Sequence, residues 1–311
     1  MESRVLASAE CSGFKFSSKS DARTKVAPRS TAKKLLIALT TNYDTTMTPA
    51  SLAVKVLETS EQVGEYVAGK IAVGISEANR QGARYVIGCP SGRTPRSTLV
   101  ALKSLVQKAE LDLSKLVVVM MDDYVFEVSP GSYENVPIDV HFSCRKWAIT
   151  ELRDALNAGL PEAKQIKAEN VRCPDGSQLE NFEKWIDEIG GIDLFILASG
   201  AGDGHVAFNG PGEPRASLTR IVKLAEQTRL DNLKTFPDFR DITEVPRFGA
   251  SVGIATIADK SKSAVMILLG PAKREAFSKI TSSTGYDENW PATIISECPN
   301  ALVVADQAAA S

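Results

Sequence analysis

Short apolar runs recur along the sequence, and amphipathic helical patterns separate them. Continuous apolar strands that alternate with helices are typical of a mostly parallel sheet with helices on both faces. The sequence therefore predicts a doubly wound, Rossmann-like α/β fold, in which ligands bind outside the carboxyl ends of the strands. The predicted strands are Val54–Leu57, Tyr85–Gly88, Leu116–Met121, Ile192–Leu197, Val265–Leu269 and Ala301–Ala305.

Local signals place the starts of the helices between these strands. Thr59-Ser60-Glu61-Gln62 has the composition of a capping box and precedes an apolar stripe at helical spacing. Thr94 and Pro95 predict the start of a second helix, because proline is favoured at the first helical position, where no backbone N–H is needed. A third helical pattern runs from Leu179 to Ile189.

Composition and charge favour a small-molecule ligand over a nucleic acid or a membrane. The 311 residues carry 36 Lys and Arg against 38 Asp and Glu, well mixed along the chain, for a formal net charge of -2. This balance predicts no broad basic face for nucleic acid or anionic lipid. No apolar stretch approaches the roughly 18 residues of a membrane-spanning helix, and nothing at the N-terminus resembles a secretion signal. We expect a cytoplasmic protein.

The cysteines do not form a metal-binding pattern. Their number is odd, none are spaced as Cys-x-x-Cys, and the chain has only two histidines to join them. We expect reduced thiols and no metal site. The cysteines are Cys11, Cys89, Cys144, Cys173 and Cys298.

Residues 1–50 differ from the rest of the chain. Ser, Thr, Ala and Lys/Arg dominate this segment, and basic residues outnumber acidic ones. We expect a disordered extension, followed by a single α/β domain over residues 51–311. The same composition resembles an organelle transit peptide, which would place the protein in an organelle, and a start codon upstream of Met47 explains it equally well.

Chemically distinctive residues follow the predicted strands, so they are expected to converge at one edge of the sheet. The first group lies in a tight turn between a strand and a helix, where backbone N–H groups, hydroxyls and a guanidinium could hold a phosphate. No Gly-Lys-Ser/Thr follows, so the turn is not a Walker loop. When the segment is taken alone, an ordinary strand-to-helix turn with a Thr cap explains it better than a phosphate loop does. The candidate phosphate ligands are Ser91, Gly92, Arg93 and Thr94.

Two adjacent carboxylates, Asp122 and Asp123, stand after the third strand. Neighbours on a strand face opposite ways, so only one of them needs to point into a cleft. We take Asp122 as the candidate base and expect Asp123 to hold backbone or a neighbouring side chain. The alternative is that both carboxylates cap the next turn.

The glycine-rich segment Ser199–Gly212 follows the fourth strand and contains His205. Histidine is the side chain best suited to moving protons near neutral pH, and Asp203 could orient it. Lys273, after the fifth strand, could reach an anion as a point charge that complements Arg93. A structural histidine and a solvated lysine are the alternatives.

Glycine spacing argues against two common enzyme classes. No clean Gly-x-Gly-x-x-Gly is present, and Gly200–Gly204 has the wrong spacing for a dinucleotide fingerprint. No Gly-x-Ser-x-Gly elbow is present either, which argues against an α/β-hydrolase.

Taken together, these segments resemble the glucosamine-6-phosphate deaminases, within the larger group that includes the 6-phosphogluconolactonases. The resemblance runs from about Thr59 to Ala305, with the segments in the same order and at similar spacing. It implies the sugar-phosphate isomerase type of α/β fold. The matching segments are Pro90–Pro95, Met121–Tyr124, Gly202–Asn209, Thr219-Arg220, Thr228-Arg229 and Leu269–Lys273.

The resemblance also implies a reaction. His205, oriented by Asp203, would open the sugar ring, and Asp122 would move a proton between C2 and C1. An enolamine would then lose ammonia and leave fructose 6-phosphate, without a metal or an organic cofactor. Ring opening and enolisation need an acid/base at O5 and a second base near C2, which two separated groups provide. Lys273 and Lys234 would help to bind the phosphate, and a homo-oligomer is expected by analogy alone.

Four positions depart from the family's pattern. Gly210 replaces an acidic residue that completes the network of the histidine, and Glu213 is the nearby carboxylate that could take its place. Arg93 replaces the second glycine of the phosphate loop, Lys234 an arginine, and Cys298 a histidine. Lysine keeps the charge of arginine but loses its bidentate fork.

Two alternatives to a deaminase stay open at the level of sequence. A 6-phosphogluconolactonase would use the histidine to activate water, but the Thr-Ala-Ser type of segment that normally follows is absent. A non-catalytic relative that binds a sugar phosphate is the other, and Gly210 and Cys298 motivate it. The deaminase is favoured because Val206–Asn209 is deaminase-like.

Overall fold

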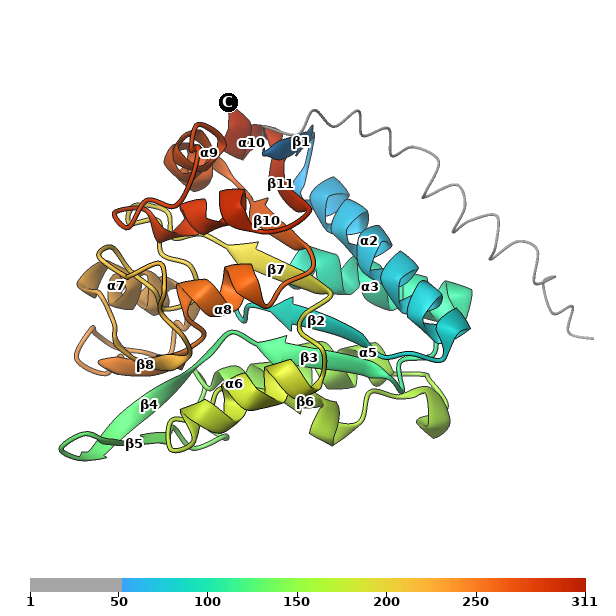
Figure 1. Cartoon of the computed structure of the whole chain (residues 1–311), viewed down its shortest axis with the longest axis horizontal. Coiled ribbons are helices and arrows are strands. Elements are labelled where there is room, and N and C mark those ends of the chain that lie inside the picture. Colours follow the sequence, from blue (N-terminus) through green and yellow to red (C-terminus); the bar gives the residue numbers. More distant parts are fainter. Residues whose placement is uncertain (1–51) are drawn as a thin grey trace, which may run out of the picture.

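The computed structural model describes residues 52–311, so the predicted N-terminal extension and Cys11 lie outside the described residues. Seven strands pair in parallel in the order β1-β11-β10-β7-β2-β3-β6 (Figure 1). The predicted doubly wound α/β fold is confirmed. The strands are β1 Ala53–Leu57, β2 Tyr85–Cys89, β3 Leu116–Met120, β6 Val171–Arg172, β7 Leu194–Ala198, β10 Ala264–Leu268 and β11 Ala301–Asp306.

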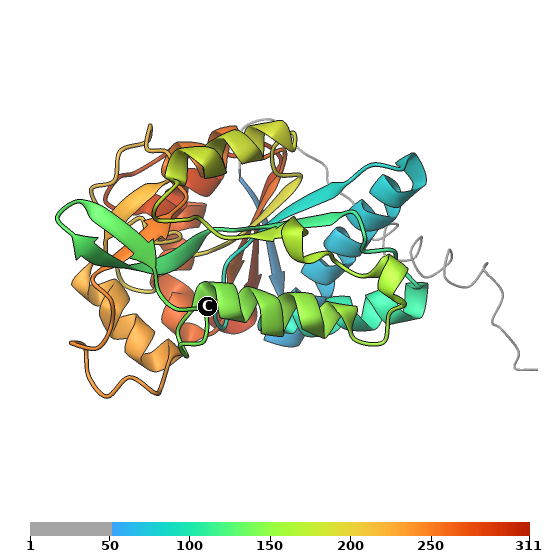
Figure 2. The same cartoon turned by 90° about the horizontal axis from the view of Figure 1, so that it is seen from below.

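Helices cover both faces of this sheet. Successive residues of a buried strand point to opposite faces, so each face presents apolar side chains that a helix can bury. In β3, Val117 and Val119 pack in one apolar core with α6 (Leu179–Glu188) and α8 (Ile254–Asp259), whereas Val118 and Met120 pack in the other with α2 (Ser60–Gln81) and α3 (Arg96–Ala109). Figure 2 shows α6 on one side of the sheet and α5 on the other. The α-helices are α2 Ser60–Gln81, α3 Arg96–Ala109, α4 Cys144–Trp147, α5 Ala155–Asn157, α6 Leu179–Glu188, α7 Glu226–Thr235, α8 Ile254–Asp259, α9 Arg274–Thr281 and α10 Gln307–Ala310. A π-helix spans Ala148–Asp154, and 3₁₀ helices span Glu162–Lys164, Ala168–Asn170, Pro271–Lys273 and Pro291–Glu297.

The helix starts follow the local signals, with one shift. Thr59 is the N-cap of α2, and its side chain accepts a hydrogen bond from the Gln62 N–H at 3.3 Å. Helix α3 begins at Arg96, so Pro95 occupies the cap position and not the first helical position. The predicted start was therefore early by one residue.

A second, antiparallel sheet was not predicted. Its strands pair in the order β5-β4-β9-β8, and β4 follows β3 almost directly, so that the chain leaves the parallel sheet at its carboxyl edge (Figure 1). An aromatic cluster that includes Tyr124, Phe208 and Phe239 packs beneath it. This sheet covers one side of the carboxyl edge. Its strands are β4 Asp122–Ser129, β5 Ser132–Asn135, β8 Arg220–Lys223 and β9 Phe248–Ser251.

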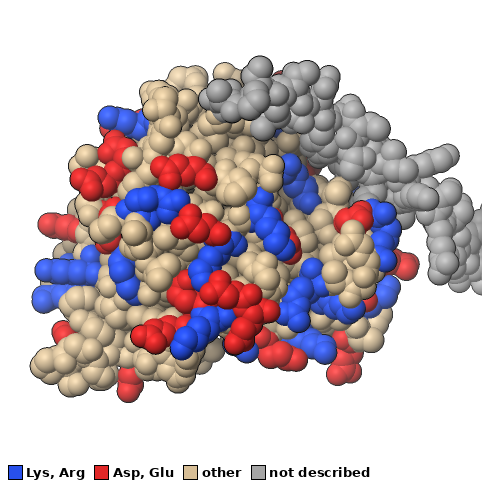
Figure 3. Space-filling model, in the orientation of Figure 1, with Lys and Arg blue, Asp and Glu red and all other residues tan. Residues whose placement is uncertain are grey.

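The surface agrees with the mixed charge of the sequence. Acidic and basic side chains are interspersed on the face shown in Figure 3, and neither sign covers it alone. Within residues 52–311, no helix combines the length and the apolar character needed to cross a membrane.

Candidate active site

The topology of the parallel sheet determines where a ligand can bind. From β2 the chain continues to β3 on one side, whereas β7, β10 and β11 succeed each other on the other side, so the order reverses between β2 and β7. Such a switch point opens a crevice at the carboxyl ends of the strands. A cavity of about 480 Å³ lies here, lined by residues that follow β2, β3, β7 and β10. The predicted site residues that line it are Ser91, Gly92, Arg93, Thr94, Asp122, His205, Lys234 and Lys273.

The loop after β2 forms one end of this cavity. Gly92 has φ +83°, a left-handed conformation that favours glycine, and the Thr235 methyl group lies 3.5 Å from where a Cβ would stand. The Arg93 guanidinium is exposed and makes no ion pair within residues 52–311. This end therefore offers a free cation beside a tight backbone turn.

Lys273 adds a second cation to this end of the cavity. Its Nζ donates a hydrogen bond to the backbone carbonyl of Ser199, at the end of β7. Burial lowers the pKa of Lys273, the Asp231 carboxylate opposes this change, and the Arg93 charge adds to it. Lys234 lies on α7 with an exposed side chain 3.7 Å from Asp231. An anion that neutralised these cations would remove their mutual repulsion.

Asp122 lies at the start of β4 and is 7% exposed. Burial and the neighbouring Asp123 charge raise its pKa to about 7, while the Cys144 thiol and His205 oppose the shift. A carboxyl group with this pKa is half ionised near neutral pH, which suits proton transfer in both directions.

Asp123 faces away from the cavity, as its alternation with Asp122 on the strand predicts. Its carboxylate accepts hydrogen bonds from Asn135 Nδ2 at 3.0 Å, from Arg145 Nε at 2.8 Å and from the Cys144 N–H at 2.9 Å. The expectation that Asp123 holds backbone and a neighbouring side chain is confirmed.

His205 and Asp203 form a close pair. His205 Nδ1 lies 2.7 Å from Asp203 Oδ1, and the His205 backbone N–H donates to the same oxygen at 3.2 Å. Burial raises the pKa of Asp203, but the hydrogen bonds from His205 outweigh it and hold the pKa below its ordinary value. A Cβ on Gly200 would stand 2.1 Å from Asp203 Oδ1 and 2.4 Å from His205 Nδ1, so only glycine leaves room for the pair. Asp203 itself lies behind His205 and not on the cavity wall.

Helix α7, which contains the expected phosphate ligand Lys234 and the Thr228-Arg229 pair, was not predicted as a helix, and it forms one wall of the cavity. Four of its five lining residues, Thr228, Asp231, Asn232 and Thr235, stand at positions i, i+3, i+4 and i+7, which place them on one face, and Lys234 is the fifth. Thr228 is 2% exposed, with its hydroxyl 3.3 Å from His205 Nδ1 and 3.4 Å from Asp203 Oδ2. Polar side chains at helical spacing next to the Thr228-Arg229 pair were the signal that could have revealed this face.

The geometry shows whether Glu213 replaces the acidic residue that is missing at Gly210. A Cβ on Gly210 would lie 3.5 Å from Ala225 Cβ, so nothing crowds the position. Glu213 does not approach His205: its carboxylate pairs with Arg220, whose guanidinium also donates to Asn209 Oδ1 at 2.9 Å. Glu213 therefore does not stand in for the missing acidic residue.

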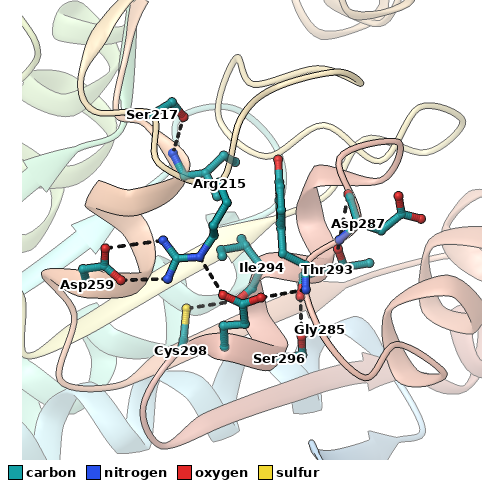
Figure 4. Close-up of polar contacts among 12 residues, drawn as sticks. Arg215, Ser217, Asp259, Gly285, Asp287, Thr293, Ile294, Ser296 and Cys298 are labelled. Carbon is teal, nitrogen blue, oxygen red and sulfur yellow. Dashed lines mark hydrogen bonds and ion pairs between the residues drawn. The ribbon is translucent and has the colours of Figure 1, made fainter.

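Cys298 lies outside the cavity, within an ion-pair cluster shown in Figure 4. Its thiol donates to the Ile294 carbonyl at 3.5 Å. In the same cluster, Arg215 contacts Asp259 at 2.7 Å and Glu297 at 2.6 Å (Figure 4). These pairs tie the loop that follows the His205 segment to α8 and to the last 3₁₀ helix. The cluster therefore fixes this loop from the side away from the cavity.

Comparisons with known proteins agree with this geometry. A glucosamine-6-phosphate deaminase of Shouchella clausii is 31% identical over 253 residues, covering 79% of this chain and 93% of that protein. A glucosamine-6-phosphate isomerase of Candida albicans is 30% identical over 255 residues, covering 79% and 92%. No family model matches the chain.

Solved structures give the same result. The structure of a monomeric glucosamine-6-phosphate deaminase superposes with a TM-score of 0.69 at 27% identity, covering 83% of this chain and 99% of that one. A 6-phosphogluconolactonase from Leishmania guyanensis has a TM-score of 0.59 at 14% identity and covers 83% and 97%, which shows a shared fold alone. The fold and the cavity thus define an α/β enzyme of the sugar-phosphate isomerase type. Within that class, the chain belongs to the glucosamine-6-phosphate deaminase family.

Proposed function

We propose that this chain converts glucosamine 6-phosphate and water to fructose 6-phosphate and ammonia. The observation that carries the proposal is that one cavity presents a carboxyl group with a pKa near 7, an Asp-His pair and a cationic end. These are the groups that an isomerisation of a phosphorylated amino sugar requires. Family relatives named for this activity support the same choice.

The cationic end would bind the phosphate of the substrate. The backbone N–H groups of the loop after β2 and the side chains of Ser91 and Thr94 would supply neutral hydrogen bonds. Arg93, Lys234 and Lys273 would supply the charge. With the phosphate fixed, the sugar carbons would lie between Asp122 and His205. The chemical step would then lose less entropy, because the reacting groups are already oriented.

His205 would begin the reaction at the ring. Its imidazole would protonate the ring oxygen O5 while water takes the proton of the C1 hydroxyl, which opens the ring to the aldehyde. Asp203 would hold the orientation of the imidazole through the Nδ1 hydrogen bond and stabilise its protonated form.

Asp122 would then carry out the isomerisation. Its carboxylate would take the proton from C2 to give an enolamine, and the resulting acid would return a proton to C1. Once a proton has also passed from the nitrogen to O1, the product of these transfers is an imine at C2. Water adds to C2 and ammonia leaves, so that fructose 6-phosphate results and no electrons are gained or lost.

The direct test is an assay of purified protein with glucosamine 6-phosphate, in which ammonia and fructose 6-phosphate are both measured. Hydrolysis of 6-phosphogluconolactone is measured in parallel. Release of both products in equal amounts supports the proposal. Lactone hydrolysis alone would identify the lactonase instead, and phosphate-sugar binding without turnover would identify a non-catalytic relative.

The proposal extends to organisation and location. Residues 51–311 would form one catalytic domain, working in the cytoplasm, or in an organelle if residues 1–50 are a transit peptide. Copies of the chain would self-associate, although the solved deaminase relative is described as monomeric. Light scattering of the purified protein and imaging of a fluorescent fusion of residues 1–50 test these two points.

A further inference from the structure

Helix α7 spans the distance between the two functional ends of the cavity. At its first turn, the Thr228 hydroxyl lies 3.3 Å from His205 Nδ1 and 3.4 Å from Asp203 Oδ2. At its last turn, Lys234 and Thr235 line the cavity beside the loop that contains Gly92. A single helix of ten residues therefore contacts both the Asp-His pair and the phosphate end.

Polar side chains form the cavity face of this helix, whereas Leu233 on another face packs against the aromatic cluster and Arg229 donates to the backbone carbonyls of Ile242 and Val245. Thr228 is the one residue of α7 that is buried. The Asn232 side chain, one turn further on, has a buried Nδ2 with no hydrogen-bond partner among the described residues. A buried donor without a partner costs roughly 1–3 kcal/mol, so an acceptor from a ligand at this point would stabilise the helix position.

We propose that Thr228 is a positioning residue, through which α7 makes the alignment of the Asp203–His205 pair depend on an anion at the phosphate end. The inference rests on the proposed function for its kinetic consequences. Phosphate oxygens accept from Asn232 and neutralise the nearby cations, which fixes α7 in place. The Thr228 hydroxyl then donates to the Asp203 carboxylate and restricts the rotation of both members of the pair.

The position of Thr228 explains how the pair is held without a carboxylate at position 210. Gly210 offers no side chain, and Glu213 is engaged by Arg220. The Thr228 hydroxyl is the side-chain group of the described residues, besides Asp203, that lies within hydrogen-bond distance of His205 Nδ1. Because Thr228 lies on a helix that also contacts the phosphate end, the position of its hydroxyl can respond to bound substrate. A side chain at position 210 would lack this connection.

The first test needs no catalysis. The chain has two histidines, so ¹⁵N-labelled imidazole signals in an NMR spectrum resolve His205 once a His141→Gln variant has assigned the other. We expect inorganic phosphate, added at constant ionic strength, to shift the His205 signals in the unmodified protein. Thr228→Val keeps the shape of the side chain without the hydroxyl, and it should lose most of this shift. Thr228→Ser restores the hydroxyl and should recover it.

The matched control is Thr281→Val in α9, whose hydroxyl donates to the Phe277 carbonyl at 2.7 Å within its own helix. This variant removes the same atoms far from the coupling and should respond to phosphate as the unmodified protein does. An equal His205 shift in Thr228→Val and in the unmodified protein would overturn the proposal. So would the absence of any His205 shift when phosphate binding is detected by calorimetry.

The kinetic test uses unphosphorylated glucosamine. Inorganic phosphate should raise the turnover of glucosamine by about tenfold, because it supplies the missing anion at the far end of α7. With glucosamine 6-phosphate, Thr228→Val should lower kcat by about tenfold and leave KM nearly unchanged, and Thr228→Ser should recover kcat. Unchanged kcat in Thr228→Val would refute the positioning role. Failure of the unmodified protein to turn over glucosamine 6-phosphate would instead refute the proposed function, and the NMR test would still decide the coupling.

Discussion

The raised pKa of Asp122 predicts that this residue destabilises the folded protein as pH rises. The carboxyl group has an ordinary pKa of 3.8 and a folded-state pKa of about 7, because of burial and the neighbouring Asp123 charge. A group whose pKa is raised on folding stabilises the protein fully below its unfolded pKa. That contribution is lost as pH rises toward the folded pKa, because only the folded state then holds the proton.

The size of the expected change in stability follows from the difference between the unfolded and folded pKa values of Asp122. Each unit of pKa difference corresponds to about 1.4 kcal/mol, so the full window from 3.8 to about 7 corresponds to about 4 kcal/mol. Between pH 5 and pH 8, only the two pH units from 5 to the folded pKa of about 7 contribute, and they correspond to about 3 kcal/mol of unfolding free energy. For a domain of this size, such a difference corresponds to a melting temperature change on the order of 10 °C.

The assay compares Asp122→Asn with the unmodified protein at pH 5 and pH 8 by thermal or urea unfolding. Asparagine has a similar shape but does not ionise, so the titrations of groups that do not interact with Asp122 cancel in the difference between the two proteins. When the pH rises from 5 to 8, we expect the free energy of unfolding of the variant to increase by about 3 kcal/mol relative to that of the unmodified protein. Parallel pH profiles for the two proteins would refute the raised pKa. The same variant should lose turnover by about 100-fold or more if Asp122 is the base, and normal turnover would refute that role.

Three further substitutions test other parts of the site. Lys273→Ala should raise KM for glucosamine 6-phosphate by about tenfold or more with a smaller change in kcat, since it removes a charge from the phosphate end; an unchanged KM would exclude Lys273 from that end. His205→Gln should lower kcat by about 100-fold with the cyclic substrate, and full activity would contradict its role in ring opening. Gly204→Ala should destabilise the fold by about 2–4 kcal/mol in urea unfolding, because Gly204 has φ +61° and a Cβ would stand 2.4 Å from the Trp290 ring. Gly202→Ala, with nothing within 4 Å of its Cβ, is the control, and equal effects of the two changes would contradict this reasoning.

The parallel sheet could be predicted from the sequence because its strands are buried on both faces. Such strands appear as continuous apolar runs, and β3 and β10 were found within one residue at each end. The antiparallel sheet was missed because its strands β5, β8 and β9 are only four residues long, and β5 and β8 are partly exposed, so their composition does not distinguish them from loops.

The site divides in a similar way. Residues that directly follow strands, such as Asp122, His205 and Lys273, could be placed at the carboxyl edge, because parallel strands bring their ends together. The catalytic roles of these residues, and the division of the chain at residue 50, stay predictions. Thr228 could not be assigned a role in this way, because α7 follows a strand of the second sheet and reaches the cavity only through the folding of that sheet.

The α/β class, the segments that converge and the family could be inferred from the amino-acid sequence, because hydrophobic periodicity and local motifs are properties of the chain. The folded structure was needed to establish that Glu213 pairs with Arg220 and that Cys298 lies away from the cavity. It also decided that Asp122 is buried beside another carboxylate and that Thr228 meets the Asp203–His205 pair. These facts depend on which side chains from distant segments become neighbours. Hydrogen bonds and pKa values depend on such distances, which separation along the chain does not specify.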